Sequence, residues 1–179
     1  MKSTFIETLE SEKPHQDHRE KLKPYERFIG NWEFDWVGHK EDGSTWTVPG
    51  EWHFSWVLEG RAIQDNWICP RTDLRGSGEY PDDGYGTSIR FYDGKEDCIK
   101  VVFVGPIQSS LCVLKASFTE DRITQNQILT GEGEEIARWI FSDISQHSFK
   151  WEAYTSKDNG ESWKLDQEVF ARETEVRRR

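Results

Sequence analysis

IARWIFSDISQHSFKWEAYTSKDNGESWKLDQEVFAR, residues 136–172, contains three segments in which apolar and polar side chains alternate. A period of two residues is typical of strands that bury one face. Two groups of turn-forming residues separate these segments, one centred near residue 145 and the other containing Asn159-Gly160. Because glycine readily adopts the positive φ of a tight turn, the stretch predicts two successive antiparallel hairpins.

The first of these hairpins places large aromatic side chains together on one face. A turn centred at residue 145 sets Phe141 opposite Phe149 and Trp139 opposite Trp151. Such facing aromatic pairs stabilise a sheet and favour burial of the face that carries them. We therefore expect these strands to contribute an aromatic layer to the core.

The opposite face of the same hairpin carries charge, because the same register pairs Arg138 with Glu152 and brings Tyr154 nearby. Two arrangements follow. If the aromatic face points inward, Arg138 and Glu152 form a surface ion pair worth about 0.5 kcal/mol. If the polar face points inward, all three side chains line a cavity and anchor an acidic or hydroxylated ligand.

The rest of the chain repeats the same pattern. Its alternating segments and Gly-containing turns predict ten strands near residues 31–39, 45–57, 60–69, 85–92, 97–104, 108–118, 122–130, 134–142, 147–155 and 162–172. Residues 17–29 predict a short helix ahead of the first strand. The expected fold is all-β: one antiparallel up-and-down β-barrel of about ten strands, lipocalin-like or calycin-like, with a short N-terminal helix.

The expected organisation is a flexible leader at residues 1–16, a barrel domain at 17–173 and a tail at 174–179. One connection is longer than the others, since residues 70–84 are rich in Gly, Pro and Asp and offer little to bury. Long loops on a barrel of short turns often carry function. This loop is therefore expected either to cover the open end of the barrel or to be a plain connector.

The amino-acid composition of the chain limits the kinds of molecule that it is expected to bind. The chain has 33 acidic and 23 basic residues, for a net charge of -10, which repels nucleic-acid phosphates and anionic lipid surfaces. Hydrophobic residues make up only 35% of the chain, but aromatic residues reach 13%, so the core is expected to be aromatic. Residues 1–20 hold five acidic side chains and no apolar run, so we expect no signal peptide and a cytoplasmic location.

The sequence predicts no metal site, no cofactor and no familiar catalytic motif. Cys69, Cys98 and Cys112 do not have the spacing of a zinc site, and we expect them to be free thiols. His15 and His18 lie three residues apart in the polar leader without a third ligand nearby. Nucleophile elbows, phosphate-binding loops and dinucleotide fingerprints are absent from the sequence.

Two short motifs fit the predicted barrel. Residues 156–163, SKDNGESW, resemble the Asp-box, in which an Asp side chain accepts backbone hydrogen bonds, Gly takes a positive φ and Trp caps the hairpin. Here it implies a rigid turn and not glycoside chemistry. Gly30-Asn31-Trp32 is similar to the lipocalin Gly-x-Trp motif, which implies that Trp32 packs beneath an Arg of the last strand, here Arg172.

A wider pattern combines residues 28–32 (FIGNW), 58–61 (LEGR), 85–93 (YGTSIRFYD) and the turn at 156–163 with its upstream Phe149-x-Trp151. Together these segments resemble the DUF1579-type family of small calycin-like bacterial proteins, over about residues 25–173. The resemblance implies a calycin barrel. It implies no chemistry, because that family has no settled activity.

Candidate site residues are charged or aromatic side chains within strands otherwise rich in apolar residues, since such charges must be paired, exposed or functional. They are Trp36, Trp56, Asp65, Arg90, Arg138, Glu152 and Tyr154. The leading hypothesis is a barrel that binds an amphipathic or aromatic small molecule. One alternative is a cofactor-free isomerase, lyase or hydrolase with Asp65 or Glu152 as base and Arg90 or Arg138 as electrostatic stabiliser. Another is a module that associates with a second copy as a homodimer.

Overall fold

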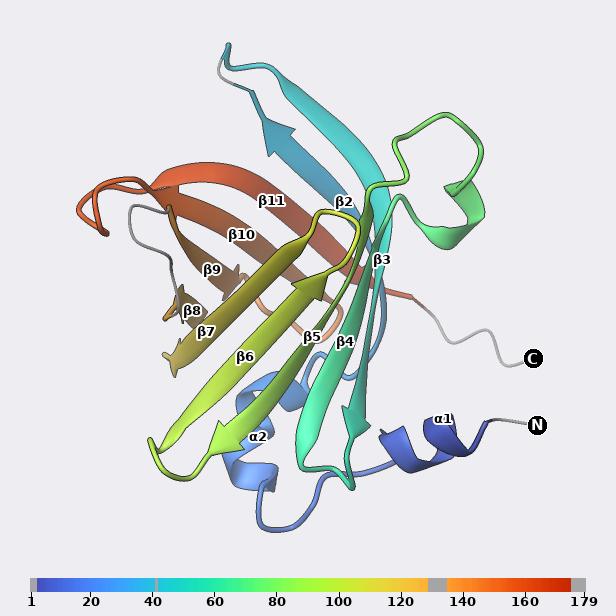
Figure 1. Ribbon diagram of the computed structural model, residues 1–179, viewed down its shortest axis with the longest axis vertical. Coiled ribbons are helices and arrows are strands. Elements are labelled where there is room, and N and C mark those ends of the chain that lie inside the picture. Colours follow the sequence, from blue (N-terminus) through green and yellow to red (C-terminus); the bar gives the residue numbers. More distant parts are fainter. Residues whose placement is uncertain (1–2, 41, 129–134, 175–179) are drawn as a thin grey trace.

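A computed structural model describes residues 3–40, 42–128 and 135–174, and these residues form a closed barrel (Figure 1). Each barrel strand pairs antiparallel with the next in sequence, and the last pairs with the first. The strands are β2 (Gly30–His39), β3 (Thr45–Val57), β4 (Ala62–Cys69), β5 (Gly84–Asp93), β6 (Cys98–Gly105), β7 (Ser110–Phe118), β8 (Ile123–Gln127), β9 (Ile136–Ser142), β10 (Ser148–Ser156) and β11 (Lys164–Glu173).

This architecture confirms the predicted ten-stranded antiparallel barrel. The strand bounds differ from the expected ones by at most three residues. A meander of hairpins closes in this way because every strand then finds a hydrogen-bonding partner on both sides. The expected helix is α2 (Arg19–Glu26), and the loop after β4 contains the short 3-10 helix η1 (Thr72–Leu74).

The N-terminal segment has more structure than the predicted flexible leader. It forms α1 (Thr4–Leu9) and β1 (Glu10–Ser11), and β1 pairs with the end of β3. The His15 backbone N–H also donates to the Gly60 carbonyl at 2.9 Å. The pairing occurs because β3 extends past the start of β2 and leaves backbone groups free to bond β1. Of the predicted tail, residues 175–179 lie outside the described residues.

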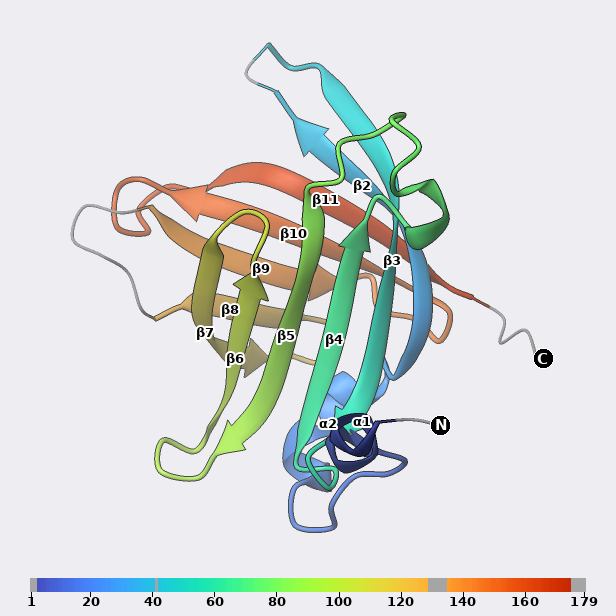
Figure 2. The same ribbon diagram turned by 45° about the vertical axis from the view of Figure 1, so that its right-hand side comes forward.

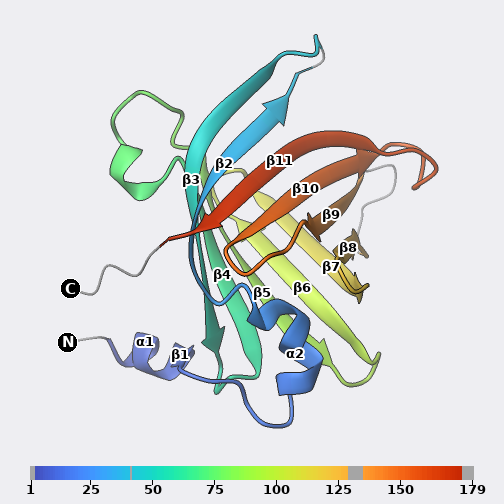
Figure 3. The same ribbon diagram turned by 180° about the vertical axis from the view of Figure 1, so that it is seen from behind.

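Helix α2 closes one end of the barrel. Figures 1 and 3 show it beneath the strands, at the end opposite the tip of the β2–β3 hairpin. Its Leu22 and Tyr25 are fully buried, as is Phe28 in the turn that follows. The Phe28 ring contacts the rings of Phe141 and Phe149, each at a centroid distance of 4.9 Å. Leu22, Tyr25 and Phe28 therefore pack with Phe141 and Phe149 into a mainly aromatic group of side chains, called the plug below, that fills this end of the barrel.

The β9–β10 hairpin has the predicted faces but a different register. Trp151 pairs with Phe141 and Tyr154 pairs with Arg138, so the strands are shifted by two residues. The connecting loop spans residues 143–147 and is closed by a hydrogen bond from the Ser145 N–H to the Ser148 carbonyl, which moves the turn centre to 146. A shift of two preserves which side chains share a face. The aromatic face points inward, and the predicted Arg138–Glu152 pairing is wrong.

The lipocalin-type contact between Trp32 and Arg172 is also absent. Trp32 is buried and packs edge to face against Phe149 at 4.8 Å. Arg172 points to the outer surface and forms an ion pair with Asp35 at 2.9 Å. The reason is the alternation of strand side chains, because Arg172 pairs with the outward-facing Glu33.

The turn at residues 156–163 has the predicted chemistry. The Asp158 carboxylate accepts a hydrogen bond from the Ser162 N–H at 2.8 Å, and Gly160 has a φ of +90°. These bonds lower the pKa of Asp158 to about 2, with the Ser162 hydroxyl making the largest contribution. The Trp163 indole N–H donates to the Gly160 carbonyl at 3.1 Å, which places the indole ring over the turn.

The plug predicts a large stability loss on Trp32→Ala. We expect this substitution to lower the free energy of unfolding by about 3 to 5 kcal/mol, because it empties a large aromatic site in a packed core. Urea denaturation monitored by circular dichroism measures the change. Leu111→Ala is the control, since Leu111 is 68% exposed, and should cost less than about 0.5 kcal/mol. A loss below about 1 kcal/mol for Trp32→Ala would contradict the plug assignment.

Candidate functional site

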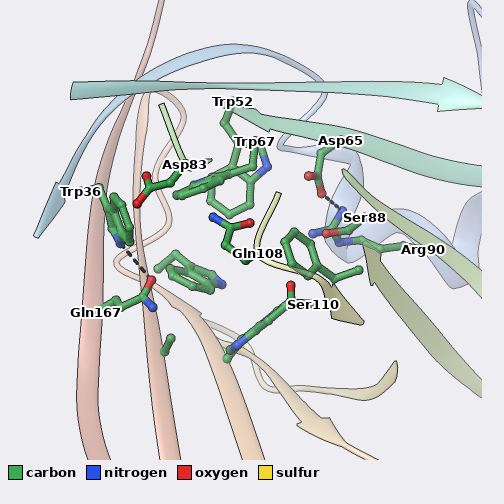
Figure 4. Close-up of a pocket in the computed structure, with 14 residues that line it drawn as sticks. Trp36, Trp52, Asp65, Trp67, Asp83, Ser88, Arg90, Gln108, Ser110 and Gln167 are labelled. Carbon is green, nitrogen blue, oxygen red and sulfur yellow. Dashed lines mark hydrogen bonds and ion pairs between the residues drawn. The ribbon is translucent and has the colours of Figure 1, made fainter. Parts of the chain in front are cut away.

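The barrel interior above the plug contains a cavity of about 390 Å³ (Figure 4). Strands β2 to β7 and β9 to β11 supply most of its wall, and two loops complete it. Its lining residues are Trp36, Trp52, Asp65, Trp67, Asp83, Ser88, Arg90, Phe103, Gln108, Ser110, Trp139, Trp151, Ala153 and Gln167. The volume lies within the range of about 300 to 1,000 Å³ that is usual for small-molecule sites.

Five tryptophans dominate the wall, and they hold one another in place. Trp36 meets Trp67 edge to face at 5.2 Å, and Trp139 meets Trp151 in the same way at 5.6 Å. The rings come from inward positions of β2, β3, β4, β9 and β10, where the period of two places side chains on one face. Edge-to-face contacts of this kind fix ring orientation, so the aromatic wall is preorganised.

The floor of the cavity holds a buried ion pair. Arg90 on β5 donates from Nη1 to the Asp65 Oδ2 atom on β4. Each residue is only 1% exposed. Because Asp65 pairs across the sheet with Ser88, Arg90 lies one diagonal step away on the same inward face. Removing two charges from water is costly, so such a pair persists only when each partner compensates the other.

Aromatic rings of the plug surround the Arg90 guanidinium from below. Its central carbon lies 5.2 Å from the Tyr25 ring centre and 5.4 Å from that of Phe54. Tyr25 also receives a hydrogen bond from Gln125 Nε2 at 2.6 Å. Burial raises the pKa of Tyr25 to about 12, although the nearby Arg90 charge opposes the shift. Tyr25 thus keeps its proton at neutral pH.

Some polar atoms at the floor have no hydrogen-bond partner within the described part of the protein. Asp65 Oδ1 accepts none, although Oδ2 of the same carboxylate is bonded to Arg90. Trp52 Nε1 donates none, and its side chain also lines the cavity. Buried polar atoms without partners are uncommon in folded proteins. Arg90 Nε also donates none, so three of the lining side chains each carry one buried polar atom without a partner.

The open end of the cavity is more polar. Gln108 and Ser110 come from the β6–β7 hairpin, and Asp83 comes from the loop before β5. In Figure 4 Asp83 and Trp36 lie on the same side of the cavity, away from the Asp65–Arg90 pair. The Trp36 indole N–H donates to Gln167 Oε1 at 2.9 Å, which holds both side chains at the rim.

The structure brings together three of the predicted site residues. Trp36, Asp65 and Arg90 all line the cavity. Trp56 is not part of this lining. It is buried in the core near the closed end, where it pairs across the sheet with Ile63.

The other three predicted site residues, Arg138, Glu152 and Tyr154, lie on the outer face of β9 and β10, because the aromatic side chains of those strands take the inward positions. Glu152 accepts hydrogen bonds from Lys150 and Tyr154, each at 3.0 Å. Arg138 donates to Asn126 at 2.7 Å and stacks over Trp163 at 3.8 Å. These side chains are occupied by surface contacts and do not reach the cavity.

Sequence reasoning did not select several lining residues. Trp52, Trp67, Trp139 and Trp151 occupy inward positions of alternating strands, so the period of two could have assigned them to the cavity. Asp83 had no such signal, because it lies in the loop of residues 70–83 where no alternation exists. That loop contributes only Asp83 to the cavity lining and extends beside the barrel in Figure 2.

The described residues contain no group of three or more His, Cys, Asp or Glu side chains placed to hold a metal ion. Cys69, Cys98 and Cys112 are free thiols, and all three are buried. Burial raises the pKa of Cys69 to about 12. Within the described ranges no helix has the length and apolarity needed to span a membrane.

Comparison with known proteins supports the fold. No family model and no curated protein sequence matches the chain. Solved structures with a similar fold include Rv2717c from M. tuberculosis and the S-type phycobiliprotein lyase CPES from Guillardia theta. The first has a TM-score of 0.58 at 13% identity and covers 86% of this chain and 97% of its own. The second has a TM-score of 0.58 at 12% identity and covers 87% of this chain and 93% of its own.

At these identities the likeness shows the fold alone. It agrees with the calycin-like barrel that the resemblance to the DUF1579-type family implied. Because no family model matches, membership of that family is not confirmed. The comparisons also do not connect the turn at residues 156–163 with Asp-box proteins.

The buried ion pair predicts strong energetic coupling between Asp65 and Arg90. We expect Asp65→Asn to lower the free energy of unfolding by about 3 to 5 kcal/mol, because it leaves Arg90 buried without its anion. A double-mutant cycle with Arg90→Met, followed by urea denaturation, should give a coupling energy above about 2 kcal/mol.

The exposed ion pair of Asp35 and Arg172 provides the matched control. The corresponding cycle, with Asp35→Asn and Arg172→Met, should give a coupling below about 1 kcal/mol. Equal coupling in the two cycles would show that burial does not set the strength of the Asp65–Arg90 interaction.

Proposed function

We propose that this protein binds a small molecule with an aromatic body inside the barrel. The observation that carries the proposal is the cavity of about 390 Å³, walled by five tryptophans above a buried ion pair. Small barrels either fill their interior with side chains or hold one small ligand. Here the side chains fill one end only, and the other end stays open.

The wall suits a flat, apolar ligand. Aromatic side chains provide a large contact area, and these rings are already held by contacts with one another. A preorganised site loses little conformational entropy when it binds. The aromatic body of the ligand would lie among Trp52, Trp67 and Trp151, and its affinity would come mainly from removing apolar surface from water.

Polar groups at the floor of the cavity would orient the bound ligand. A ligand N–H or O–H group that reaches Asp65 Oδ1 would satisfy an acceptor that the protein leaves without a partner. Trp52 Nε1 would in turn donate to a ligand acceptor atom. A few polar groups within an apolar pocket are the usual means by which such sites select one ligand over another.

The likeness to a protein named as a phycobiliprotein lyase is consistent with small-molecule binding by this type of barrel. The likeness does not identify the ligand. The size, the aromatic wall and the polar floor of the cavity in this chain support the proposal independently of it.

The two alternative functions have less support. As a catalytic base, Asp65 would have to reach a substrate proton, but one oxygen of its carboxylate is already bonded to Arg90. Glu152 and Arg138 lie outside the cavity. Self-association would use exposed apolar side chains of the outer surface, such as Leu111 and Val104, and would leave the cavity unexplained.

A neutral fluorescent probe tests the proposal. We expect N-phenyl-1-naphthylamine to bind with a stoichiometry of one, with enhanced probe emission and quenched tryptophan emission. Ala153→Phe should abolish this binding, because Ala153 lines the cavity and a larger side chain there fills it. Fluorescence titration of both proteins makes the measurement.

Tyr154→Trp is the matched control, since it adds bulk on the outer face of the same strand and should leave binding unchanged. Thermal melts must show that both variants are folded. The proposal is wrong if folded Ala153→Phe protein binds the probe as tightly as the original chain does.

A further inference from the structure

The charges that line the cavity do not balance. Asp65, Arg90 and Asp83 are the charged side chains in its described lining. Asp65 and Arg90 neutralise each other at the floor. Asp83 stands at the open end and has no oppositely charged partner among the other side chains of the lining. The cavity therefore has a formal charge of minus one, located near its entrance.

The aromatic wall has the same electrostatic preference. The face of an indole ring carries partial negative charge and attracts cations more strongly than the other aromatic side chains do. Five indoles line this cavity, and Trp36 lies on the same side of it as Asp83 in Figure 4. A positively charged group at the entrance would therefore meet a carboxylate and an aromatic surface together.

An anionic group would find no comparable partner at the entrance. Arg75, a cation in the same loop as Asp83, is fixed outside the cavity lining. Its guanidinium donates to the Gly84 carbonyl at 3.0 Å and to the Asp82 carbonyl at 2.9 Å, and it lies over the Tyr85 ring. Arg90 lies at the floor of the cavity, away from the entrance, and its charge is paired with that of Asp65. The whole chain, with a net charge of -10, further repels anions.

We propose that the natural ligand is an organic cation: an aromatic ring system whose positively charged nitrogen lies between Asp83 and the Trp36 face. This inference rests on the proposed function, since it assigns the charge of the molecule that the cavity holds. The aromatic body extends toward the floor, and the charge stays at the wetter entrance. At the entrance the ligand cation stays in contact with water. Binding therefore does not include the cost of moving an unpaired charge into the barrel interior.

Three probes with one ring system test the sign of the preferred charge. They are trimethyl(naphthalen-1-ylmethyl)ammonium, the neutral naphthalen-1-ylmethanol and the anionic naphthalene-1-methanesulfonate, each titrated by isothermal calorimetry. We expect the cation to bind about threefold to thirtyfold more tightly than the neutral probe, and the anion to bind most weakly. The preference for the cation should decrease as salt is added, because the entrance is partly open to solvent.

Asp83→Asn tests the assigned anchor. We expect the affinity for the cation to fall by about threefold to tenfold, while the affinity for the neutral probe stays the same. Asp82→Asn is the matched control, since Asp82 is adjacent in sequence, does not line the cavity and accepts a hydrogen bond from the Gly76 N–H that an Asn oxygen can also accept. It should leave all three affinities unchanged.

The outcomes separate this inference from the proposed function. If the neutral probe binds and the cation binds no more tightly, the cavity holds ligands but does not select cations, and the inference is overturned. A preference for the cation that survives Asp83→Asn also overturns the assignment of Asp83. If none of the three probes binds, and N-phenyl-1-naphthylamine does not bind either, the proposed function itself fails.

Discussion

The buried contact between Asp65 and Arg90 organises the interior of this barrel. Two opposite charges on adjacent strands are removed from water and lie against aromatic rings. Such a pair must stay together, because separation would leave each charge buried without compensation. The ion pair lies between two regions of the barrel interior. Below it the side chains pack as a closed aromatic plug, and above it the barrel remains open as a cavity.

The plug gives the cavity a single orientation. Helix α2 and Phe28 fill one end, so that access comes from the end where the β6–β7 hairpin and the loop before β5 lie. Tyr25 links the two regions, since its ring stacks on Arg90 and its hydroxyl accepts a hydrogen bond from Gln125. The helix thus supports the floor of the site as well as closing the barrel.

The cavity combines features that point to ligand binding more than to catalysis. Its aromatic rings are mutually braced, its one buried carboxylate is bonded to an arginine, and its free carboxylate stands at the entrance. Rv2717c and the lyase CPES share the barrel at 13% and 12% identity, which leaves the lining of each barrel free to differ. Function in this fold therefore depends on the particular side chains that face inward.

The sequence alone determined the barrel, because alternation with a period of two and well-spaced turn residues are local properties of each hairpin. It also singled out Asp65 and Arg90, since charges within apolar strands must be compensated. Only the tertiary structure decided the rest. A loop of five residues moved the β9–β10 register by two and removed the pairing of Arg138 with Glu152. Asp83 reached the cavity from a loop without any periodic pattern, because closure of the barrel, and not local sequence, brings that loop to the entrance.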